Sequence, residues 1–347
     1  MRILTLTSAC VLTMVSYAAS AEPLQVQIFN SNGTATQGEY EPPAQVKQPW
    51  RIGIAIPHLK DPYWLAAAYG AMAEAERLGV QARLVAAQGY TDVTGQLNQL
   101  DNLVVEGVDA IVLAAVGPHA QSQKVSKIVE GGTPVIGMIN PIETDAVRVR
   151  RGISYKILAQ KAGEYFKEFT GVRPTKVALL PGPAGSGWAE DLEQGFVGAV
   201  KDQSNIEIVD IKYGDTGKDT QMTLLQNILQ AHPDVDYIVG NPVAAEAAPR
   251  LLATLGNTNT KVVSLIATPP VMNLVEREQV LMFPSDQAAL LARLAVDAAV
   301  DVLEGRDIAA SMGSTITIVT KDNVGTFNRK GTFAPDDYRP VFQVNWN

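Results

Sequence analysis

An internal repeat with an offset of about 125 residues is the feature that most constrains how this chain folds. Three pairs of segments carry it: Arg51 and Lys176 (125 residues apart), Gly70 and Gly195 (125), and Val108–Val112 and Val235–Val239 (127). Matches that keep their order at a nearly constant offset are typical of two structural units of similar build. The sequence therefore predicts two lobes, and 347 residues suit two domains of roughly 100–200 residues each.

Short apolar runs alternate with helical patterns inside each unit. Arg51–Pro57 is an apolar, β-branched run, and Tyr63–Leu78 then shows helical periodicity that Gly79 closes. Strands that are almost wholly apolar and alternate with helices are typical of a parallel sheet covered on both faces. The predicted fold class is α/β, with two similar doubly wound parallel-sheet lobes and a ligand cleft between them. Further strands are expected at Val108–Ala115, Thr133–Ile139, Lys176–Pro181, Leu281–Asp286 and Thr315–Val319.

Three chain crossings are expected to join the lobes as a hinge. They are predicted near residues 151–153, 267–269 and 314–318. Lobe 1 would then comprise residues 48–152 and 268–315, and lobe 2 residues 153–267 and 316–347. The polar segment 22–47 contains several Gly and Pro residues, and we expect an irregular N-terminal extension there.

The first 21 residues have the pattern of a secretory signal peptide. Arg2 precedes an apolar run that is too short to span a bilayer, and Ala19–Ala21 has the small-x-small pattern that predicts cleavage before Glu22. Cys10 raises a lipoprotein alternative, which the very short apolar segment before it disfavours. The mature chain is thus predicted to be periplasmic and, since Cys10 is the sole cysteine, free of disulfides and thiol chemistry.

Charge and motifs exclude several classes of function. The net charge is −8 without a cluster of Lys and Arg, so nucleic acid is not an expected partner. The three histidines, His58, His119 and His232, lack metal-binding spacing, and neither a metal nor a cofactor is expected. No Gly-x-Ser-x-Gly or His-Glu-x-x-His motif is present, so the chain is predicted not to be an enzyme.

Aromatic residues gather where the cleft is expected. Ligands of open parallel sheets bind beyond the carboxyl ends of the strands, and Tyr63, Trp64 and Tyr90 follow such ends. Aromatic faces attract alkylammonium groups or sugar faces, and Asp61 adds a negative charge. Tyr63 could equally pack into the sheet. Asp286 ends a strand at the cleft, where it could bind ligand or cap the next helix.

The glycine-rich segment Pro181–Trp188 joins a predicted strand to a predicted helix. Exposed N–H groups at a helix start can hold an anion or an oxide oxygen. The segment lacks the Gly-x-Gly-x-x-Gly order, however, so a tight turn that needs glycine backbone angles is the favoured interpretation.

Over residues 48–347 the chain resembles the type I periplasmic binding proteins of the ribose and galactose group. The resemblance is carried by RIGIAIPHLKDPYWLAAAYGAMAEAERLGV, by the Gln96/Gln99 helix before GVDAIVLAA, and by VLMFPSDQ before a helix that ends in Leu303-Glu304-Gly305. These patterns imply the fold and three hinge crossings. They do not specify the ligand.

The chain is more closely similar to the TorT-type periplasmic sensor proteins. The segments that carry this similarity are Leu59–Leu65, Gly89-Tyr90, Leu180–Pro183, Ala244–Ala248, Ser285–Gln287 and Tyr338–Val341. The resemblance implies a protein that binds trimethylamine N-oxide, with Asp61, Tyr63, Trp64 and Tyr90 in an aromatic cage. It also implies that the periplasmic sensor domain of a membrane histidine kinase reads lobe closure.

Two walls of the family's cage are changed here. Tyr155 stands near the first crossing where the family presents a Trp, and Ile266 stands near the second where the family has another aromatic residue. Trp188 is a candidate replacement for one wall. The ligand could therefore be a relative of trimethylamine N-oxide.

An importer is the alternative to a sensor. In that hypothesis the chain is the substrate-binding component of an ABC importer for a sugar or polyol, with Asp61, Asn140, Asn241 and Asp286 holding hydroxyl groups. The predicted ligand-binding residues are Asp61, Tyr63, Trp64, Tyr90, Tyr155, Trp188, Asn241 and Asp286.

Overall fold

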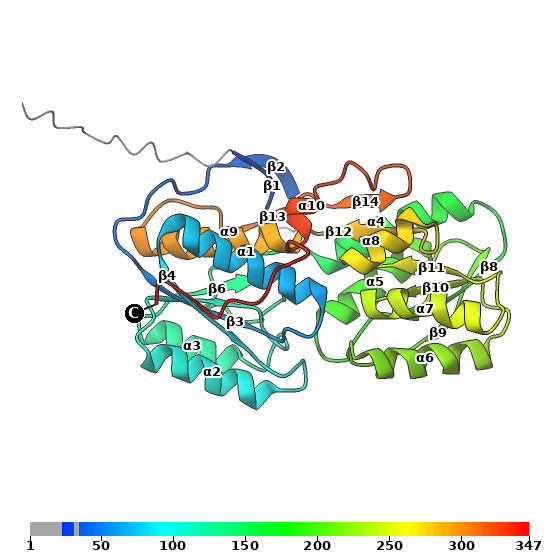
Figure 1. Cartoon of the computed structure of the whole chain (residues 1–347), viewed down its shortest axis with the longest axis horizontal. Helices are drawn as coiled ribbons and strands as arrows, with labels where there is room; N and C mark the ends of the chain where they lie inside the picture. Colours follow the sequence, from blue (N-terminus) through cyan, green and yellow to red (C-terminus); the bar gives the residue numbers. More distant parts are fainter. Residues whose placement is uncertain (1–22, 31–34, 347) are drawn as a thin grey trace, which may run out of the picture.

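A computed structural model describes residues 23–30 and 35–346, so the predicted signal peptide lies outside the described residues. Figure 1 shows two lobes side by side, each a sheet with helices on both faces. Among the described residues, lobe 1 has a nine-stranded sheet in the order β15-β4-β3-β5-β6-β7-β13-β1-β2. Lobe 2 has a four-stranded sheet, β11-β10-β8-β9, and the two-stranded pair β12-β14. The predicted α/β class with two parallel-sheet lobes is confirmed.

Six neighbouring strands of lobe 1, from β4 to β13, are parallel, and antiparallel strands flank them at both edges. The strands of lobe 1 are β1 (Leu24–Phe29), β2 (Ala35–Tyr40), β3 (Arg51–Ile56), β4 (Gln81–Ala86), β5 (Ala110–Leu113), β6 (Val135–Met138), β7 (Val149–Arg151), β13 (Ser311–Ser314) and β15 (Gln343–Val344). Its helices are α1 (Pro62–Leu78), α2 (Val93–Val105), α3 (Ser122–Glu130) and α9 (Ala288–Glu304).

Lobe 2 repeats the design with a smaller sheet, whose four strands are all parallel. Its strands are β8 (Thr175–Leu180), β9 (Ile206–Ile211), β10 (Tyr237–Gly240), β11 (Lys261–Ser264), β12 (Met282–Ser285) and β14 (Thr317–Thr320). Its helices are α4 (Tyr155–Thr170), α5 (Trp188–Val200), α6 (Lys218–Ala231), α7 (Pro242–Thr254) and α8 (Pro269–Glu276), and the short α10 (Arg329–Thr332) follows β14.

Glycines of the repeat set the closest helix contacts in both lobes. A Cβ atom on Gly70 of α1 would clash with the backbone oxygen of Ala289 in α9. A Cβ atom on Gly195 of α5 would clash in the same way with the backbone oxygen of Lys156 in α4. The 125-residue offset between Gly70 and Gly195 therefore reflects one packing requirement that both lobes share.

The chain passes between the lobes at three places that lie together at the hinge. Residues 152–154 join β7 to α4, residues 286–287 join β12 to α9, and residues 315–316 join β13 to β14. Gln287 links the second and third crossings, because its Nε2 donates to the carbonyl oxygen of Thr315 at 3.0 Å. The first and third crossings lie close to their predicted positions.

The second crossing differs from its predicted position at residues 267–269. Thr268 instead caps α8, and Val271, Met272 and Val275 of that helix are buried in the core of lobe 2. β12 then pairs with β14. Residues 268–285 therefore belong to lobe 2, since the apolar face of α8 has its partners there.

The C-terminal segment also differs from the prediction, which placed it in lobe 2. Phe333 is buried with lobe 2 residues, and the chain then runs back over α1, where Tyr338 contacts Tyr69 edge-to-face. β15 finally pairs with β4 at the edge of the lobe 1 sheet. The segment from Phe333 to Val344 thus bridges the two lobes (Figure 1).

The N-terminal extension is not irregular as expected. Leu24, Val26 and Ile28 alternate with polar residues in β1, and alternation of this kind is a strand signal that the prediction missed. β1 pairs with β13 and with β2, so the extension adds a hairpin to the lobe 1 sheet. The alternating residues of β1 form a strand because β13 and β2 lie beside them to pair with.

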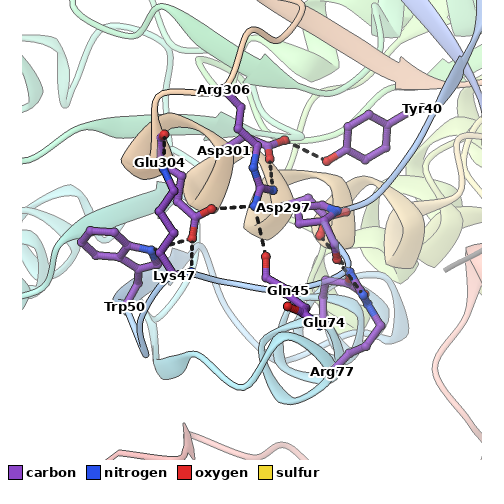
Figure 2. Close-up of polar contacts among 11 residues, drawn as sticks. Tyr40, Gln45, Lys47, Trp50, Glu74, Arg77, Asp297, Asp301, Glu304 and Arg306 are labelled. Atoms are coloured by element: carbon purple, nitrogen blue, oxygen red, sulfur yellow. Dashed lines mark hydrogen bonds and ion pairs between the residues drawn. The ribbon is translucent and has the colours of Figure 1, made fainter. Parts of the chain in front are cut away.

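Polar contacts fasten the rest of the extension to α9 (Figure 2). The Tyr40 hydroxyl donates to Asp301 at 3.0 Å, and the Lys47 backbone N–H donates to Glu304 at 2.6 Å. The Trp50 indole also donates to Glu304, at 3.2 Å. Because these carboxylates are buried, their partners in the extension stabilise lobe 1 as a unit.

Candidate ligand-binding site

A small cavity of about 20 Å³ lies between the lobes, at the carboxyl ends of the strands. It is enclosed largely by aromatic side chains. Its lining residues are Asp61, Tyr63, Trp64, Tyr90, Asn140, Tyr155, Trp188, Thr216, Pro242 and Ile266. Six of the eight predicted ligand-binding residues are in this set.

The start of α1 fixes two of these residues. Asp61 caps the helix by accepting a hydrogen bond from the Trp64 backbone N–H at 3.0 Å, and Pro62 is the first helical residue. The cap turns the indole of Trp64 inward, where it is almost fully buried and donates to the Tyr90 hydroxyl at 3.2 Å. The wall formed by Trp64 and Tyr90 is therefore held by both packing and a hydrogen bond.

Trp188 supplies the wall from lobe 2. Its ring centroid lies 5.6 Å from that of Tyr90 and 6.3 Å from that of Tyr155, and Gly182 leaves the space that the indole fills. The indole Nε1 is buried and makes no hydrogen bond of ordinary geometry to the described residues, although it lies close enough to the Tyr90 hydroxyl to lower that group's pKa. Trp188 thus presents both an aromatic face and a free N–H donor.

In the glycine-rich turn before Trp188, two backbone N–H groups are already paired with a side chain of the same turn. Gly185 and Gly187 have φ angles of 79° and 80°, which only glycine adopts at little cost. The Glu190 carboxylate accepts hydrogen bonds from the N–H groups of both glycines, at 2.6 and 2.8 Å. These donors are therefore used within the turn, which agrees with the favoured interpretation of a tight turn.

A chain of hydrogen bonds runs behind the cavity. The Tyr63 hydroxyl donates to Asp286 Oδ2 at 2.6 Å and lies 2.8 Å from the Tyr155 hydroxyl. Asp286 is buried, and its Oδ1 has no partner among the described residues. Tyr63 and Tyr155 line the cavity, whereas Asp286 stands behind them at the second crossing.

Burial changes the ionisation of the site. It raises the pKa of Asp286 to about 6, although the hydrogen bond from Tyr63 acts in the opposite direction. Burial also raises the pKa of Asp61 above its ordinary value, which the nearby His58 partly offsets. The pKa of His58 is lowered, again mainly by burial. With a pKa of about 6, Asp286 is largely ionised at neutral pH, so it places a negative charge behind the aromatic rings.

Asn241 does not line the cavity. It caps α7, where its Oδ1 accepts from the backbone N–H groups of Val243 and Ala244, and its Nδ2 donates to Gln221 at 3.0 Å. The position after a strand was correctly identified, but the same position is also the helix N-cap. That local role satisfies the polar atoms of the side chain.

Four lining residues were absent from the predicted set: Asn140, Thr216, Pro242 and Ile266. Each follows the carboxyl end of a parallel strand, so the rule that found Tyr90 applies to them. Thr216 could also have been found from the repeat, since Gly214 stands 125 residues after Gly89. Asn140 was expected to bind hydroxyl groups only in the importer hypothesis, and Ile266 was expected only as a changed wall of the family's cage.

Neither a metal centre nor a membrane span is found in the described part of the chain. No group of three or more His, Cys, Asp or Glu side chains there is arranged to hold a metal ion. Its helices are all too short or too polar to cross a bilayer.

Comparison with known proteins agrees with this architecture. Residues 52–307 match a family described as "Periplasmic binding protein domain". The periplasmic protein TorT of Escherichia coli strain K12 is 32% identical over 303 residues, which cover 86% of each chain. These relatives are binding proteins, and the chain is a ligand-binding protein and not an enzyme.

Two solved structures are similar over most of the chain. An ABC transporter solute-binding protein from Bradyrhizobium sp. BTAi1, with bound bis-tris, has a TM-score of 0.81 at 33% identity and covers 93% of this chain and 99% of its own. The complex of the TorS sensor domain with TorT has a TM-score of 0.76 at 32% identity, with coverage of 84% and 99%. The chain therefore belongs to the type I periplasmic binding proteins and, among them, to those of the TorT type.

Proposed function

We propose that this protein binds trimethylamine N-oxide or a close relative between its lobes and signals the bound state to the sensor domain of a membrane histidine kinase. The observation that carries the proposal is the aromatic enclosure of the interlobe cavity, formed by Tyr63, Trp64, Tyr90, Tyr155 and Trp188. We further propose that residues 1–21 direct export and are removed before Glu22.

The chemistry of the enclosure supports a methylated amine oxide. Methyl groups on a cationic nitrogen are attracted to aromatic faces and to nearby carboxylates such as Asp61. The oxide oxygen needs a donor, and the free indole N–H of Trp188 is one. The described residues that line the cavity include no Arg or Lys, so no cationic side chain among them repels a cationic nitrogen.

Binding would favour the closed arrangement of the lobes. Tyr90 comes from lobe 1 and Trp188 from lobe 2, and a ligand between them contacts both lobes at once. A ligand shifts a conformational equilibrium toward the state that it binds more tightly. A partner that contacts both lobes could then read their relative angle.

The TorS–TorT complex supports a kinase sensor domain as that partner. A second complex of the same two proteins was solved in the presence of trimethylamine N-oxide and has a TM-score of 0.77 to this chain at 32% identity. The two TorS–TorT complexes thus support both the proposed ligand and the proposed partner.

An ABC importer for a sugar or polyol is the second candidate. The Bradyrhizobium relative is an ABC transporter solute-binding protein, and its bound bis-tris is an amine that carries several hydroxyl groups. In this chain the side chains of Asp61, Asn140 and Thr216 are available to hydroxyl groups in the cavity. The paucity of such polar groups beside five aromatic rings favours the first candidate.

The test is a titration of the purified mature protein with trimethylamine N-oxide, trimethylamine, betaine and a panel of pentoses and hexoses. A true ligand at a hundredfold excess over Kd stabilises the folded state by roughly 2.7 kcal/mol, which a thermal shift detects readily. We expect a shift with the N-oxide that Trp64→Ala abolishes and that Trp346→Phe, a change far from the cavity, leaves intact. A shift with sugars alone would instead establish the importer function.

A TorS sensor domain can then test the partner. We expect the ligand-loaded protein to co-elute with it in size-exclusion chromatography. If the N-oxide binds but no complex forms with or without it, the ligand part of the proposal stands and the kinase part fails.

A further inference from the structure

We propose that Asp286 is a positioning residue that sets the polarity of the ligand cavity through the Tyr63–Tyr155 hydrogen-bond chain and links that chain to the hinge. The inference rests on the proposed function for its ligand class. It concerns a residue that stands behind the cavity and would act on the ligand only through its neighbours.

Hydrogen-bond donors fix the direction of the chain. An ionised carboxylate only accepts, so the single Tyr63 proton points to Asp286 Oδ2, at 2.6 Å. In the 2.8 Å contact between the two hydroxyl groups, Tyr155 must therefore be the donor. Its proton is then directed at Tyr63, and its oxygen offers only lone pairs to the cavity.

This direction gives the cavity two unlike ends. Lone pairs on Tyr155 and the negative charge behind Tyr63 favour the positively polarised methyl groups of an alkylammonium ligand. The free Nε1–H of Trp188 favours the oxygen of an N-oxide. If Asp286 were protonated, it could donate to Tyr63, the chain would reverse, and the Tyr155 proton would face the cavity.

The same carboxylate stands where the crossings meet. Tyr155 is the first residue after the first crossing, and Asp286 is itself part of the second. Ser314, immediately before the third crossing, donates its hydroxyl proton to the backbone oxygen of Asp286. A ligand that contacts Tyr63 and Tyr155 is therefore connected to the second and third crossings by hydrogen bonds, and to the first through the backbone of Tyr155.

Ionisation near physiological pH makes the inference testable. Burial raises the pKa of Asp286 to about 6, so the carboxyl group changes charge within an accessible range. Tyr63 of α1 and Tyr155 of α4 are the titratable groups that face it, and burial raises the pKa of both hydroxyls well above their ordinary values. At the far side of the cavity, Asp61 and His58 also titrate and must be separated from Asp286 by mutation.

The experiment measures the affinity of tetramethylammonium, whose charge does not depend on pH, from about pH 5 to pH 8. For the wild type we expect affinity to fall roughly tenfold on acidification, with a midpoint near the pKa of Asp286 of about 6. Asp286→Asn should bind weakly at every pH and lose this midpoint. Asp101→Asn, at an exposed carboxylate on α2, should behave as wild type. A wild-type profile in Asp286→Asn, or a flat profile in the wild type, would overturn the proposal.

Tyr63→Phe provides a second route if Asp286→Asn fails to fold. It leaves the carboxylate in place but removes the hydroxyl that connects it to Tyr155, and we expect weaker binding of the cation together with loss of the pH midpoint. Tyr155→Phe should weaken binding less, because the hydrogen bond between Tyr63 and Asp286 remains.

A ligand-free measurement separates this inference from the proposed function. If no amine binds at all, the proposed function fails, but tryptophan fluorescence can still follow Trp64 and Trp188 beside the chain. A transition near pH 6 that Asp286→Asn removes would support the chain of hydrogen bonds. Its absence in the wild type, or its persistence in Asp286→Asn, would refute it.

Discussion

Trp188 of lobe 2 forms one aromatic wall of the cavity between the lobes. Trp188 approaches Tyr90 and Tyr155 while its Nε1 stays free, so it contributes both apolar surface and a hydrogen-bond donor. Its position depends on the left-handed backbone angle of Gly187 just before it and on the space left at Gly182. The geometry of the site therefore depends on the glycines of the turn as much as on the tryptophan itself.

Trp188→Ala should weaken ligand binding by roughly tenfold or more, because an aromatic wall and a donor are lost together. Trp188→Phe should lose less, since it keeps an aromatic face. Calorimetric titration measures both, without relying on the fluorescence of the residue removed. Unchanged affinity in Trp188→Ala would show that the wall is not used.

Helices in this protein are placed by small residues at fixed positions. Gly195 lets α5 approach the backbone of α4, whereas Gly198, one turn further along the same helix, has nothing within 4 Å of the position of a Cβ atom. The two glycines thus differ in packing while sharing one helix. Substituting each in turn therefore tests whether the close contact between α4 and α5 requires glycine at position 195.

Gly195→Ala should lower the free energy of unfolding by roughly 1–3 kcal/mol, because a methyl group there is forced against backbone that has no room to move. Gly198→Ala should raise it by up to about 1 kcal/mol, because alanine favours the helix. Denaturant unfolding of both variants measures the difference. Equal effects would mean that α4 and α5 can separate freely.

Buried carboxylates couple the stability of the whole molecule to pH. In addition to Asp286, burial raises the pKa of Asp297 well above its ordinary value and raises that of Asp301, both on α9 under the N-terminal extension. A carboxyl group with a raised pKa in the folded state favours folding most when it is protonated in both states. That contribution is lost as pH rises through the pKa of the folded state.

We therefore expect the contribution of Asp286 to the free energy of unfolding to decrease between about pH 4 and pH 6, by roughly 3 kcal/mol in total. Asp286→Asn should remove this part of the pH dependence, leaving the parts that belong to Asp297 and Asp301. Thermal or denaturant unfolding of both proteins across this range measures it. Identical pH profiles would contradict the raised pKa. Ligand affinity should change in the opposite direction, so the two effects can be distinguished.

The two lobes also share buried surface. Tyr63 and Trp64 of lobe 1 and Tyr155 and Trp188 of lobe 2 lie in one continuous hydrophobic cluster. The C-terminal segment adds a second connection, from Phe333 in lobe 2 to β15 in lobe 1. The two lobes thus contact each other around the cavity.

The fold class, the two-lobed repeat and most of the aromatic residues of the cavity could be predicted from local sequence patterns. Strand and helix periodicity, helix caps such as Asp61 and Gly79, and residues that follow strand ends are local features. They reflect the conformation of a few neighbouring residues, so they can be identified without knowing what packs against them. The same reasoning found Trp64 and Tyr90 from positions close to strand ends, whereas Tyr155 was identified through the family resemblance.

Four features depend on long-range contacts and were not predicted: the second crossing, the hairpin of the N-terminal extension, the path of the C-terminal segment and the role of Asn241. The apolar face of α8 fits either lobe until its partners are known, and β1 becomes a strand edge only where β13 is available to pair with it. The contact between Tyr63 and Asp286 joins residues 223 positions apart. These features depend on which distant surfaces pack against each segment, and the residues of the segment itself do not indicate those surfaces.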